Sequence, residues 1–329
     1  MVAISNSRIQ QLLTSLKTKR IAVIGDVMID HYVWGVVSRI SPEAPVPVVE
    51  VENESVRLGG AANVAHNITS LGAQALLIGV VGDDANGAEL RRILNSANTT
   101  SDGIILDPTR PTTKKTRVIA HNQHVVRIDS EVKRDIDESV QKKILTVLEN
   151  NIHSIDGIII EDYNKGVVVK ELIHAIIDLT RRHNKIITID PKFNNFFEYK
   201  HATVFKPNVK ETEEALGRKL KTETDVVEAG KILLEKLSAQ YVLLTRSEKG
   251  MSLFEQNGTV SHIPTHAREV ADVSGAGDTV IATLTAMLAS GANIYEAATL
   301  ANIAGGIVVG EVGIVPIRPE QLRAAIEEQ

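Results

Sequence analysis

Residues 272–279 read DVSGAGDT and continue directly into the apolar run VIATLTAML, which places a glycine-rich turn at the start of a predicted helix. The first N–H groups of a helix have no intrahelical partner and carry partial positive charge, so such a turn attracts phosphate. Asp278 would repel a phosphate that is only bound, but it is useful if it accepts the proton of an attacking hydroxyl. Because Asp is also common at helix starts, this segment alone fits either a phosphate cradle or an ordinary turn.

Strand-like and helix-like segments alternate along the rest of the chain. The spacing of Ala62, Ala65, Ile68 and Leu71 is typical of a helix. Five short apolar runs are predicted as buried strands: IAVIG (21–25), ALLIGVVG (75–82), GIIIED (157–162), KIITID (185–190) and YVLLTR (241–246). The last third is predicted helical from about 276 to 310 and again from about 318. This order predicts an α/β protein in three α/β/α layers around a mostly parallel sheet.

Two segments interrupt the alternation. Residues 33–53 have the composition of strands but contain three prolines, and residues 114–128 resemble a hairpin that turns at 121–124. Strands that contain proline belong at sheet edges. We interpret both segments as a small projecting β-sheet that serves as a lid. The alternative is that they are edge strands of the main sheet.

Composition narrows the classes of protein and of partner. The chain has 329 residues, 43% of them hydrophobic, which is enough for one large domain or two smaller ones. A net charge of -5 gives no basic excess for nucleic acid or for an anionic membrane. The absence of cysteine excludes disulfides, thiolate catalysis and Cys-ligated zinc, and the ten histidines form no H-E-x-x-H cluster. No apolar run reaches about 20 residues, so we predict a soluble, cytoplasmic protein without a zinc site.

A second glycine-rich stretch precedes the helical pattern that ends near Gly72. It comprises Gly59, Gly60 and the following AAN, ending at Asn63. Glycines let a backbone approach a ligand closely, but they also serve tight packing at a helix start. No G-x-G-x-x-G follows a predicted strand and no G-x-x-x-x-G-K-[ST] occurs. The sequence therefore disfavours a dinucleotide oxidoreductase, and any ATP site must have another architecture.

The motifs gain meaning from their order. The chain contains GDVMID (25–30), GGAAN (59–63), DPK (190–192), KPNVKE (206–211), TRSEKG (245–250) and DVSGAGDT. In this order and spacing they resemble the ribokinase-like (PfkB) carbohydrate kinases, over essentially the whole chain. The longer runs GDVMIDHYVWG and SRISPEAPVPVVEV resemble the heptose 7-phosphate kinases within that family. No HxGH nucleotidyltransferase motif is present, so we expect a single-function kinase or the kinase half of a longer protein.

The resemblance implies a reaction and a phosphoryl-transfer centre. ATP would phosphorylate the anomeric C1 hydroxyl of D-glycero-β-D-manno-heptose 7-phosphate, giving the 1,7-bisphosphate for ADP-heptose and lipopolysaccharide core synthesis. Asp278 would be the general base, ionised with the help of the helix dipole. The backbone N–H groups of Gly275, Ala276 and Gly277 would form an anion hole. Alternatives are another sugar or phosphosugar kinase, or a catalytically silent regulator that binds sugar or nucleotide.

The same resemblance assigns the sugar pocket. Asp26 and Asp30 are expected at and just beyond the end of the first strand, where open α/β sheets bind ligands. Carboxylates accept hydrogen bonds from sugar hydroxyls. Gly59, Gly60 and Asn63 would belong to this pocket.

The nucleotide side is assigned in the same way. Asn208 and Glu211 match an N-x-x-E motif that organises Mg²⁺, largely through water, although the pair also fits a helix capping box. Thr245, Arg246 and Gly250 are expected to line the nucleotide. Weaker candidates are Asn302, which could equally be a buried structural amide, and Asp272, which could place a monovalent cation. Lys206 adds a cation whose role the sequence leaves open.

A substrate phosphate would need cations of its own. Seven are candidates, and one to three are expected to contact phosphate: Arg39, Lys114, Lys115, Arg117, Arg127, Lys165 and Lys192. We rank Lys165, Lys192, Arg117 and Arg127 highest. Finally, the lid would leave an apolar face exposed, and pairing two lids across a two-fold axis would cover it, so we expect a homodimer.

Overall fold

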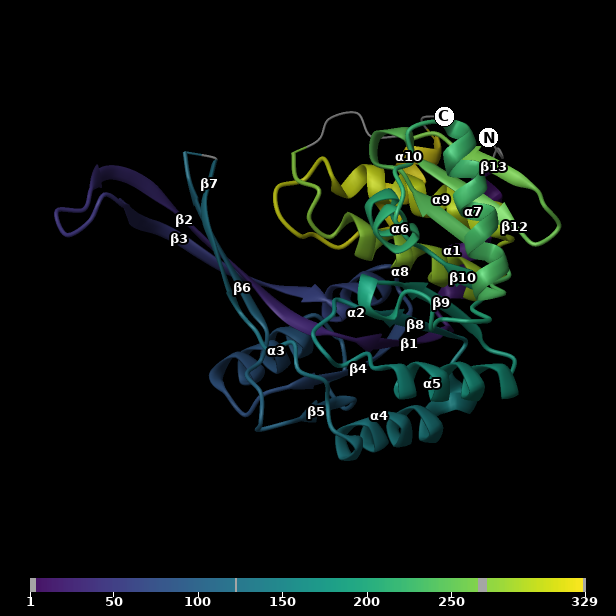
Figure 1. Ribbon diagram of the computed structural model, residues 1–329, viewed down its shortest axis with the longest axis horizontal. Coiled ribbons are helices and arrows are strands. Elements are labelled where there is room, and N and C mark those ends of the chain that lie inside the picture. The colour runs from purple at the N-terminus through teal and green to yellow at the C-terminus, as the bar shows by residue number, and fades with distance from the viewer. Residues whose placement is uncertain (1–3, 122, 266–270, 328–329) are drawn as a thin grey trace.

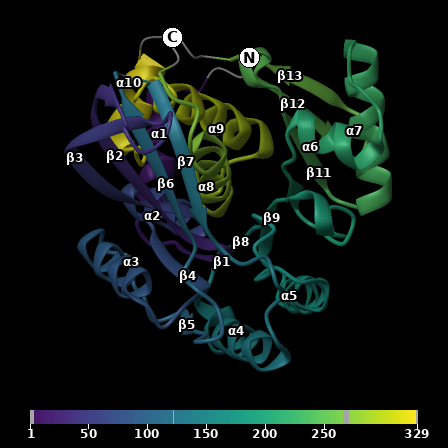
Figure 2. The same cartoon turned by 60° about the vertical axis from the view of Figure 1, so that its left-hand side comes forward.

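The computed structural model of the chain describes residues 4–121, 123–265 and 271–327. Two sheets organise this part of the chain, a large central one and a smaller one that projects from the body (Figures 1 and 2). The large sheet has nine strands in the order β13-β12-β11-β10-β9-β8-β1-β4-β5. Seven of them, from β11 to β5, run parallel, and β12 and β13 are added antiparallel at one edge.

The bounds of the main-sheet strands follow the apolar runs of the sequence. They are β1 (Arg20–Gly25), β4 (Gln74–Val81), β5 (Ile104–Leu106), β8 (Gly157–Glu161), β9 (Ile186–Asp190), β10 (Val204–Phe205), β11 (Tyr241–Thr245), β12 (Met251–Glu255) and β13 (Val260–Ile263). The helices are α1 (Asn6–Leu16), α2 (Ala61–Ser70), α3 (Ala85–Ser96), α4 (Glu138–Asn151), α5 (Lys170–Arg182), α6 (Val209–Leu216), α7 (Glu223–Leu237), α8 (Ala276–Ala289), α9 (Ile294–Val308) and α10 (Pro319–Glu327).

Helices cover both faces of the large sheet, and the alternation of strand side chains explains how. In β1, Ile21 and Val23 belong to one hydrophobic core, while Ala22 and Ile24 belong to the other. The first core packs against α1, α2, α3, α8, α9 and α10, and the second against α4, α5 and α7. The predicted three-layer α/β/α architecture is therefore confirmed.

The projecting sheet is built from β2 (Val27–Ile40), β3 (Pro47–Gly60), β6 (Lys114–Ala120) and β7 (Gln123–Ser130), in the order β3-β2-β6-β7. We call these four strands the lid. It extends from one side of the body in Figure 1, so its strands do not form an edge of the main sheet. The three prolines fall between β2 and β3 or at the first residue of β3, where no interior ladder bond is lost. The predicted hairpin of 114–128 is also found, although residue 122 in its turn lies outside the described residues.

Strand β2 begins at Val27, earlier in the chain than residue 33, where the first lid segment was predicted to start. Because β2 starts at Val27, Asp30 lies inside the first lid strand and not just beyond the end of β1. Asp26 is the single residue between the two strands. The described part of the chain has no helix whose length and apolar character would suit a membrane span.

Candidate active site

A cavity of about 620 Å³ lies where β8, β9 and β11 end and α8 begins. Ten of the residues predicted for the site line it: Lys192, Asn208, Glu211, Thr245, Gly250, Gly275, Ala276, Gly277, Asp278 and Asn302. The carboxyl ends of parallel strands and the N-terminus of a helix thus meet at one place, as expected for a ligand site in an open α/β sheet.

Asp278 lies in the first turn of α8, after Gly275, whose left-handed backbone (φ 79°) turns the chain into the helix. Two neutral donors hold the Asp278 carboxylate. Asn63 Nδ2 donates to Oδ2 at 2.8 Å, and Tyr163 Oη donates to Oδ1 at 2.8 Å. Asn63 comes from the start of α2 and Tyr163 from the loop after β8. Three separate segments therefore fix this carboxylate.

Burial controls the proton affinity of Asp278. The side chain is 3% exposed, and this burial raises the pKa of Asp278 to about 6, while the Asn63 and Tyr163 hydrogen bonds lower it. Desolvation therefore dominates the proton affinity of Asp278, and a contribution of the helix dipole to its ionisation stays a prediction. A pKa near 6 still leaves the carboxylate mostly ionised at neutral pH, and it is better matched to proton transfer than an ordinary Asp.

The backbone N–H groups of the glycine turn differ in whether the protein already supplies a hydrogen-bond acceptor for them. The Ala276 N–H donates to the Val273 carbonyl at 3.3 Å. Within the described ranges, the N–H groups of Gly275 and Gly277 have no protein acceptor. Gly275 and Gly277 are thus the better candidates for an anion hole.

Two further carboxylates lie beside Asp278. Glu161, Asp190 and Asp278 each offer an oxygen within 4.8 Å of the others. Burial, followed by the charges of Asp190 and Asp278, raises the pKa of Glu161 well above its usual value. Lys206 compensates part of this charge, because its buried Nζ lies 2.8 Å from Asp190 Oδ2. A side chain at Gly277 would lie 3.7 Å from the Lys206 Nζ, so the lysine stands beside the glycine turn.

The N-x-x-E pair forms the capping box of α6. Asn208 accepts the Glu211 N–H at 2.8 Å, and Glu211 Oε2 accepts the Asn208 N–H at 2.8 Å. Glu211 Oε1 is paired with Lys192 Nζ. Both oxygens of Glu211 therefore have protein partners, which leaves it an indirect role toward a metal, as the sequence analysis expected.

Asp26 organises the loop that carries Tyr163. Its Oδ2 accepts the N–H groups of Tyr163 (2.7 Å) and Lys165 (3.1 Å), and its Oδ1 accepts that of Val167 (3.2 Å). Burial, with the nearby Asp162, raises the pKa of Asp26 to about 6, against the effect of the three amides. These bonds favour a positioning role for Asp26 over the sugar contact predicted from sequence.

Asp30 is likewise engaged, in a buried ion pair with Arg117 of β6. The two glycines near it serve close packing. A side chain at Gly59 would meet Asp30 Oδ2 at 2.0 Å, and one at Gly60 would meet the Asp26 carbonyl oxygen at 2.4 Å. The structure thus gives the glycines a packing function that the sequence could not separate from ligand approach.

The remaining nucleotide candidates differ in placement. Thr245 and Gly250 line the cavity, but the Arg246 guanidinium turns away to Ser252 (3.0 Å) and to Glu223, so Arg246 is not part of the cavity wall. Strand β11 ends at Thr245, and the backbone of Arg246 (φ -130°, ψ 30°) has left the extended conformation, which turns its side chain away from that of Thr245. Asn302 lines the cavity and also donates to the Pro264 carbonyl at 2.6 Å.

The phosphate candidates are spread over two regions. Lys192 lies in the cavity, and Lys165 lies in the Tyr163 loop with its Nζ 2.6 Å from Glu131. Arg117 lies at the base of the lid, whereas Arg127 is 59% exposed and paired with Asp129. Arg127 faces solvent and does not line the cavity.

One lid residue contacts the segment that backs the glycine turn. Arg57 of β3 donates from Nη1 to the Ile314 carbonyl at 2.8 Å and to the Val312 carbonyl at 3.3 Å. The Ile314 side chain reaches within 3.3 Å of where a side chain at Gly275 would begin. Asp272 fastens the same segment, since its Oδ2 accepts the Gly313 N–H at 3.2 Å. We call this set of contacts the Arg57 latch.

Sequence analysis did not single out Glu161, Asp190 or Tyr163. Asp190 is in the DPK motif, of which only Lys192 was predicted to bind a ligand. Glu161 and Tyr163 flank Asp162 in the run GIIIEDYNK, and a carboxylate closing an all-apolar strand was the available signal.

Comparison with known proteins agrees with this geometry. The pfkB family carbohydrate kinase family matches residues 18–320. The bifunctional protein HldE of Helicobacter pylori (strain J99) is 46% identical over 90% of this chain, and that of Geotalea uraniireducens is 43% identical over 97%. The chain spans 64% and 65% of the length of these two relatives.

Solved structures place the fold in the same group. Ribokinase of Arabidopsis thaliana, in complex with ribose and ATP, superposes with a TM-score of 0.74 at 17% identity, covering 94% of this chain and 98% of that one. Phosphofructokinase-2 of Escherichia coli, in complex with potassium, gives 0.78 at 18% identity and the same coverages. Because the family model matches residues 18–320, the chain belongs to the pfkB family of carbohydrate kinases.

Proposed function

We propose that this kinase transfers the γ-phosphate of ATP to the anomeric C1 hydroxyl of D-glycero-β-D-manno-heptose 7-phosphate, giving the 1,7-bisphosphate for ADP-heptose and lipopolysaccharide core synthesis. The observation that carries the proposal is the Asp278 carboxylate, buried and held by Asn63 and Tyr163 at the glycine turn of α8. No other function in view requires a basic carboxylate among phosphate-binding amides.

The chemistry assigns each group one task. The C1 oxygen forms a bond to the γ-phosphorus while the bond between that phosphorus and the β–γ bridging oxygen breaks, so ADP leaves. Asp278 takes the hydroxyl proton. The N–H groups of Gly275 and Gly277, with the Lys206 ammonium beside them, stabilise the charge on the transferring phosphoryl oxygens.

The residues present also fit Mg²⁺. Its preferred ligands are hard oxygens, and Glu161, Asp190 and Asp278 provide three carboxylates close together. Within the described residues, Glu161 Oε2 is buried without a hydrogen-bond partner, as expected of a group that awaits a cation. Glu161 and Asp190 would hold the ion, with Glu211 acting indirectly. When bound, Mg²⁺ supplies charge neutralisation at the phosphate oxygens. A monovalent cation near Asp272 remains a prediction.

The choice of heptose 7-phosphate rests on sequence. It is supported by the long runs GDVMIDHYVWG and SRISPEAPVPVVEV and by the 43–46% identity to two proteins named HldE. The nucleotide would occupy the cavity bordered by Asn208, Thr245, Gly250 and Asn302. We also propose that the enzyme acts in the cytoplasm.

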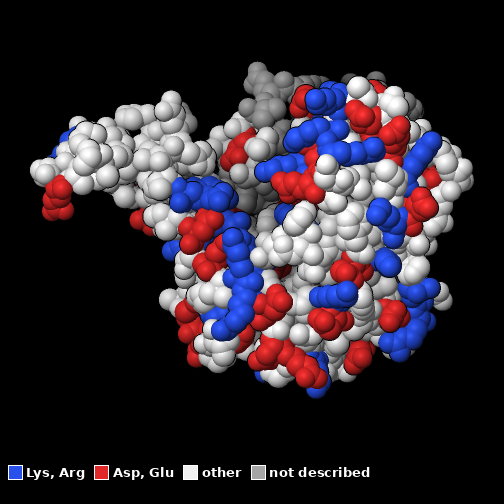
Figure 3. All heavy atoms as spheres, in the orientation of Figure 1, with Lys and Arg blue, Asp and Glu red and all other residues white. Residues whose placement is uncertain are grey.

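The lid supports the proposal of a homodimer. In the space-filling view of Figure 3 much of its visible surface is uncharged. Several large apolar side chains of the lid, and of the loop that joins β2 to β3, are exposed: Ile40, Val46, Val51, Val126 and Ile128. Apolar surface of this kind favours association, and pairing two lids across a two-fold axis would cover it.

An ADP-release assay with a panel of sugars and phosphosugars tests the acceptor, and NMR of the product locates the new phosphate. We expect turnover of heptose 7-phosphate, a phosphate on C1, and loss of turnover in Asp278→Asn. Robust turnover of another sugar with none of heptose 7-phosphate would refute the acceptor. ATP binding without ADP release for every sugar would instead indicate a silent regulator.

A further inference from the structure

Lys115, at the base of the lid, forms no ion pair with a carboxylate in the described part of the chain. It lies on β6, opposite Asp30 of β2 and Asp129 of β7 in the strand register. Both neighbouring carboxylates are taken, because Asp30 pairs with Arg117 and Asp129 pairs with Arg127. Within the part of the chain that the structure describes, no carboxylate lies within 4.0 Å of the Lys115 ammonium.

The other cations nearby are neutralised one by one. Lys165 pairs with Glu131, Lys192 with Glu211, and Lys206 with Asp190. Lys115 therefore has no ion-pair partner of its own at the junction of lid and body, although the charges of Asp30, Glu131 and Asp129 partly stabilise its ammonium. Burial, followed by the nearby charge of Lys165, lowers the pKa of Lys115, so an anion bound there would relieve an existing repulsion.

The position of this charge relative to Asp278 is defined by one tyrosine. The Lys115 Nζ lies 5.3 Å from the centre of the Tyr163 ring, and the Tyr163 hydroxyl is 2.8 Å from Asp278 Oδ1. With ordinary covalent bond lengths in the ring, the ammonium is at most about 11 Å from the Asp278 oxygen. An extended heptose 7-phosphate spans about 8–9 Å from its anomeric oxygen to its phosphorus. An acceptor hydroxyl at Asp278 thus brings the distal phosphate within reach of Lys115.

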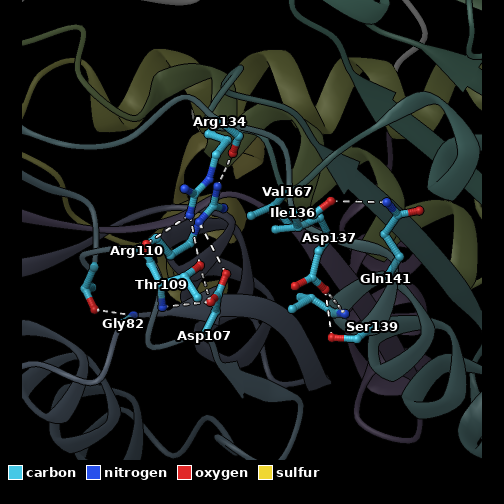
Figure 4. Close-up of polar contacts among 12 residues, drawn as sticks. Gly82, Asp107, Thr109, Arg110, Arg134, Ile136, Asp137, Ser139, Gln141 and Val167 are labelled. Carbon is cyan, nitrogen blue, oxygen red and sulfur yellow. Dashed lines mark hydrogen bonds and ion pairs between the residues drawn. The ribbon is translucent and has the colours of Figure 1, made fainter.

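The segment that faces Lys115 is held firmly. Asp26 binds three N–H groups of the loop 163–167, and the Ile136 N–H donates to the Gly166 carbonyl at 2.8 Å. Figure 4 shows further contacts next to this loop: Arg110 donates to the Arg134 carbonyl, and the Arg134 side chain donates to Thr109. Lys165 therefore lies on a loop that several hydrogen bonds hold in place.

From these contacts we propose that Lys115, assisted by Lys165, forms the subsite for the substrate's own phosphate, the group farthest from the reacting hydroxyl. The inference rests on the proposed function and deepens it: this subsite selects phosphosugars over free sugars. On sequence alone Lys115 ranks below four other cations. Its lack of a carboxylate partner depends on the strand register, which the sequence does not show. Lys165 shares its charge with Glu131, so Lys115 dominates the attraction.

Calorimetric titration of the enzyme without ATP tests the subsite separately from turnover. Heptose 7-phosphate and unphosphorylated heptose are titrated into the wild type, Lys115→Met and Lys114→Met. Lys114 is the matched control, since neighbouring residues of a strand face opposite sides of the sheet. We expect Lys115→Met to weaken binding of heptose 7-phosphate by about 10- to 100-fold and to leave binding of heptose unchanged. Lys114→Met should change neither.

Two results would overturn the subsite: equal loss for both sugars in Lys115→Met, or a wild type that gains no affinity from the 7-phosphate. If circular dichroism shows that Lys115→Met does not fold, the test is made on the wild type with inorganic phosphate. Phosphate must then compete with heptose 7-phosphate for binding if the subsite exists. ADP release separates the two proposals. Phosphate-dependent binding without turnover refutes the acceptor alone, and turnover that ignores Lys115 refutes the subsite alone.

Discussion

Replacing Asp278 by Asn should abolish turnover and stabilise the fold. The pKa of Asp278 is raised from 3.8 to about 6, mainly by burial, so folding disfavours its ionised form. One pKa unit corresponds to about 1.4 kcal/mol, and the shift therefore costs about 3 kcal/mol of stability at any pH above 6. An uncharged amide avoids this cost. It also preserves both contacts, because its oxygen can accept from Asn63 while its NH₂ donates to the Tyr163 hydroxyl oxygen.

Asp26→Asn is the matched comparison. The pKa of Asp26 is also raised to about 6, but its two oxygens accept three backbone N–H groups. An amide has a single oxygen, so its NH₂ must face the N–H of Val167 or those of Tyr163 and Lys165. A buried N–H left without an acceptor costs about 1–3 kcal/mol. We therefore expect Asp26→Asn to be no more stable than the wild type, although both substitutions remove the same charge.

Thermal unfolding as a function of pH checks both magnitudes. At pH 8 we expect Asp278→Asn to melt about 6 °C above the wild type, taking about 2 °C for each kcal/mol in a chain of this size. The folded-state pKa lies above the unfolded value, so the wild type loses stability relative to Asp278→Asn as pH rises from 3.8 to 6. The difference should vanish below pH 3.8. An Asp278→Asn protein that melts at or below the wild-type temperature at pH 8, as Asp26→Asn should, would refute the reasoning.

Three more predictions follow from the site and the lid. The plot of kcat/KM against pH should fall on its acid side with an apparent pKa of about 6, because protonated Asp278 cannot accept the hydroxyl proton; an acid limb near pH 4 in rate assays would exclude Asp278 as the base. Arg57→Ala should lower kcat by about tenfold with little change in melting temperature, because it releases the segment that packs on Gly275. Arg39→Ala, at an exposed residue of the lid, is the control and should leave kcat unchanged. Ile128→Glu should convert a dimeric wild type to monomer in light scattering, and a wild type that is monomeric at micromolar concentration would contradict the lid-paired dimer.

The sequence predicted the parts of the fold that depend on local pattern. The five apolar runs became strands because each is flanked by turns and buried on both faces, and the prolines of 33–53 marked a lid because they cannot stand inside a ladder. The helix at Ala276 was predictable for the same reason, since the glycine turn precedes an apolar stretch. Local sequence pattern was therefore enough to predict the elements whose structure depends on one segment alone.

The site contacts depend instead on how distant segments meet. Asp26 was expected to face the sugar, but the loop after β8 presents three N–H groups to it, and no property of the sequence near Asp26 indicates that. Tyr163 was overlooked because an aromatic residue in a loop is usually packing. Its role is visible only once the α8 helix brings Asp278 to its hydroxyl. The direction of Arg246 also depends on the end of a strand, because β11 stops at Thr245 and its alternation does not extend to Arg246.

Strand register links the two ends of the active site. Arg57, Asp30, Lys115 and Asp129 are consecutive partners across β3, β2, β6 and β7, so they form one row at the base of the lid. At one end of the row Arg57 holds the segment behind the glycine turn, and farther along it Lys115 lies over the tyrosine that binds Asp278. We therefore expect an anion drawn to Lys115 to bias the Arg57 latch as well, so that binding of a phosphosugar and ordering of the anion hole depend on one position of the lid.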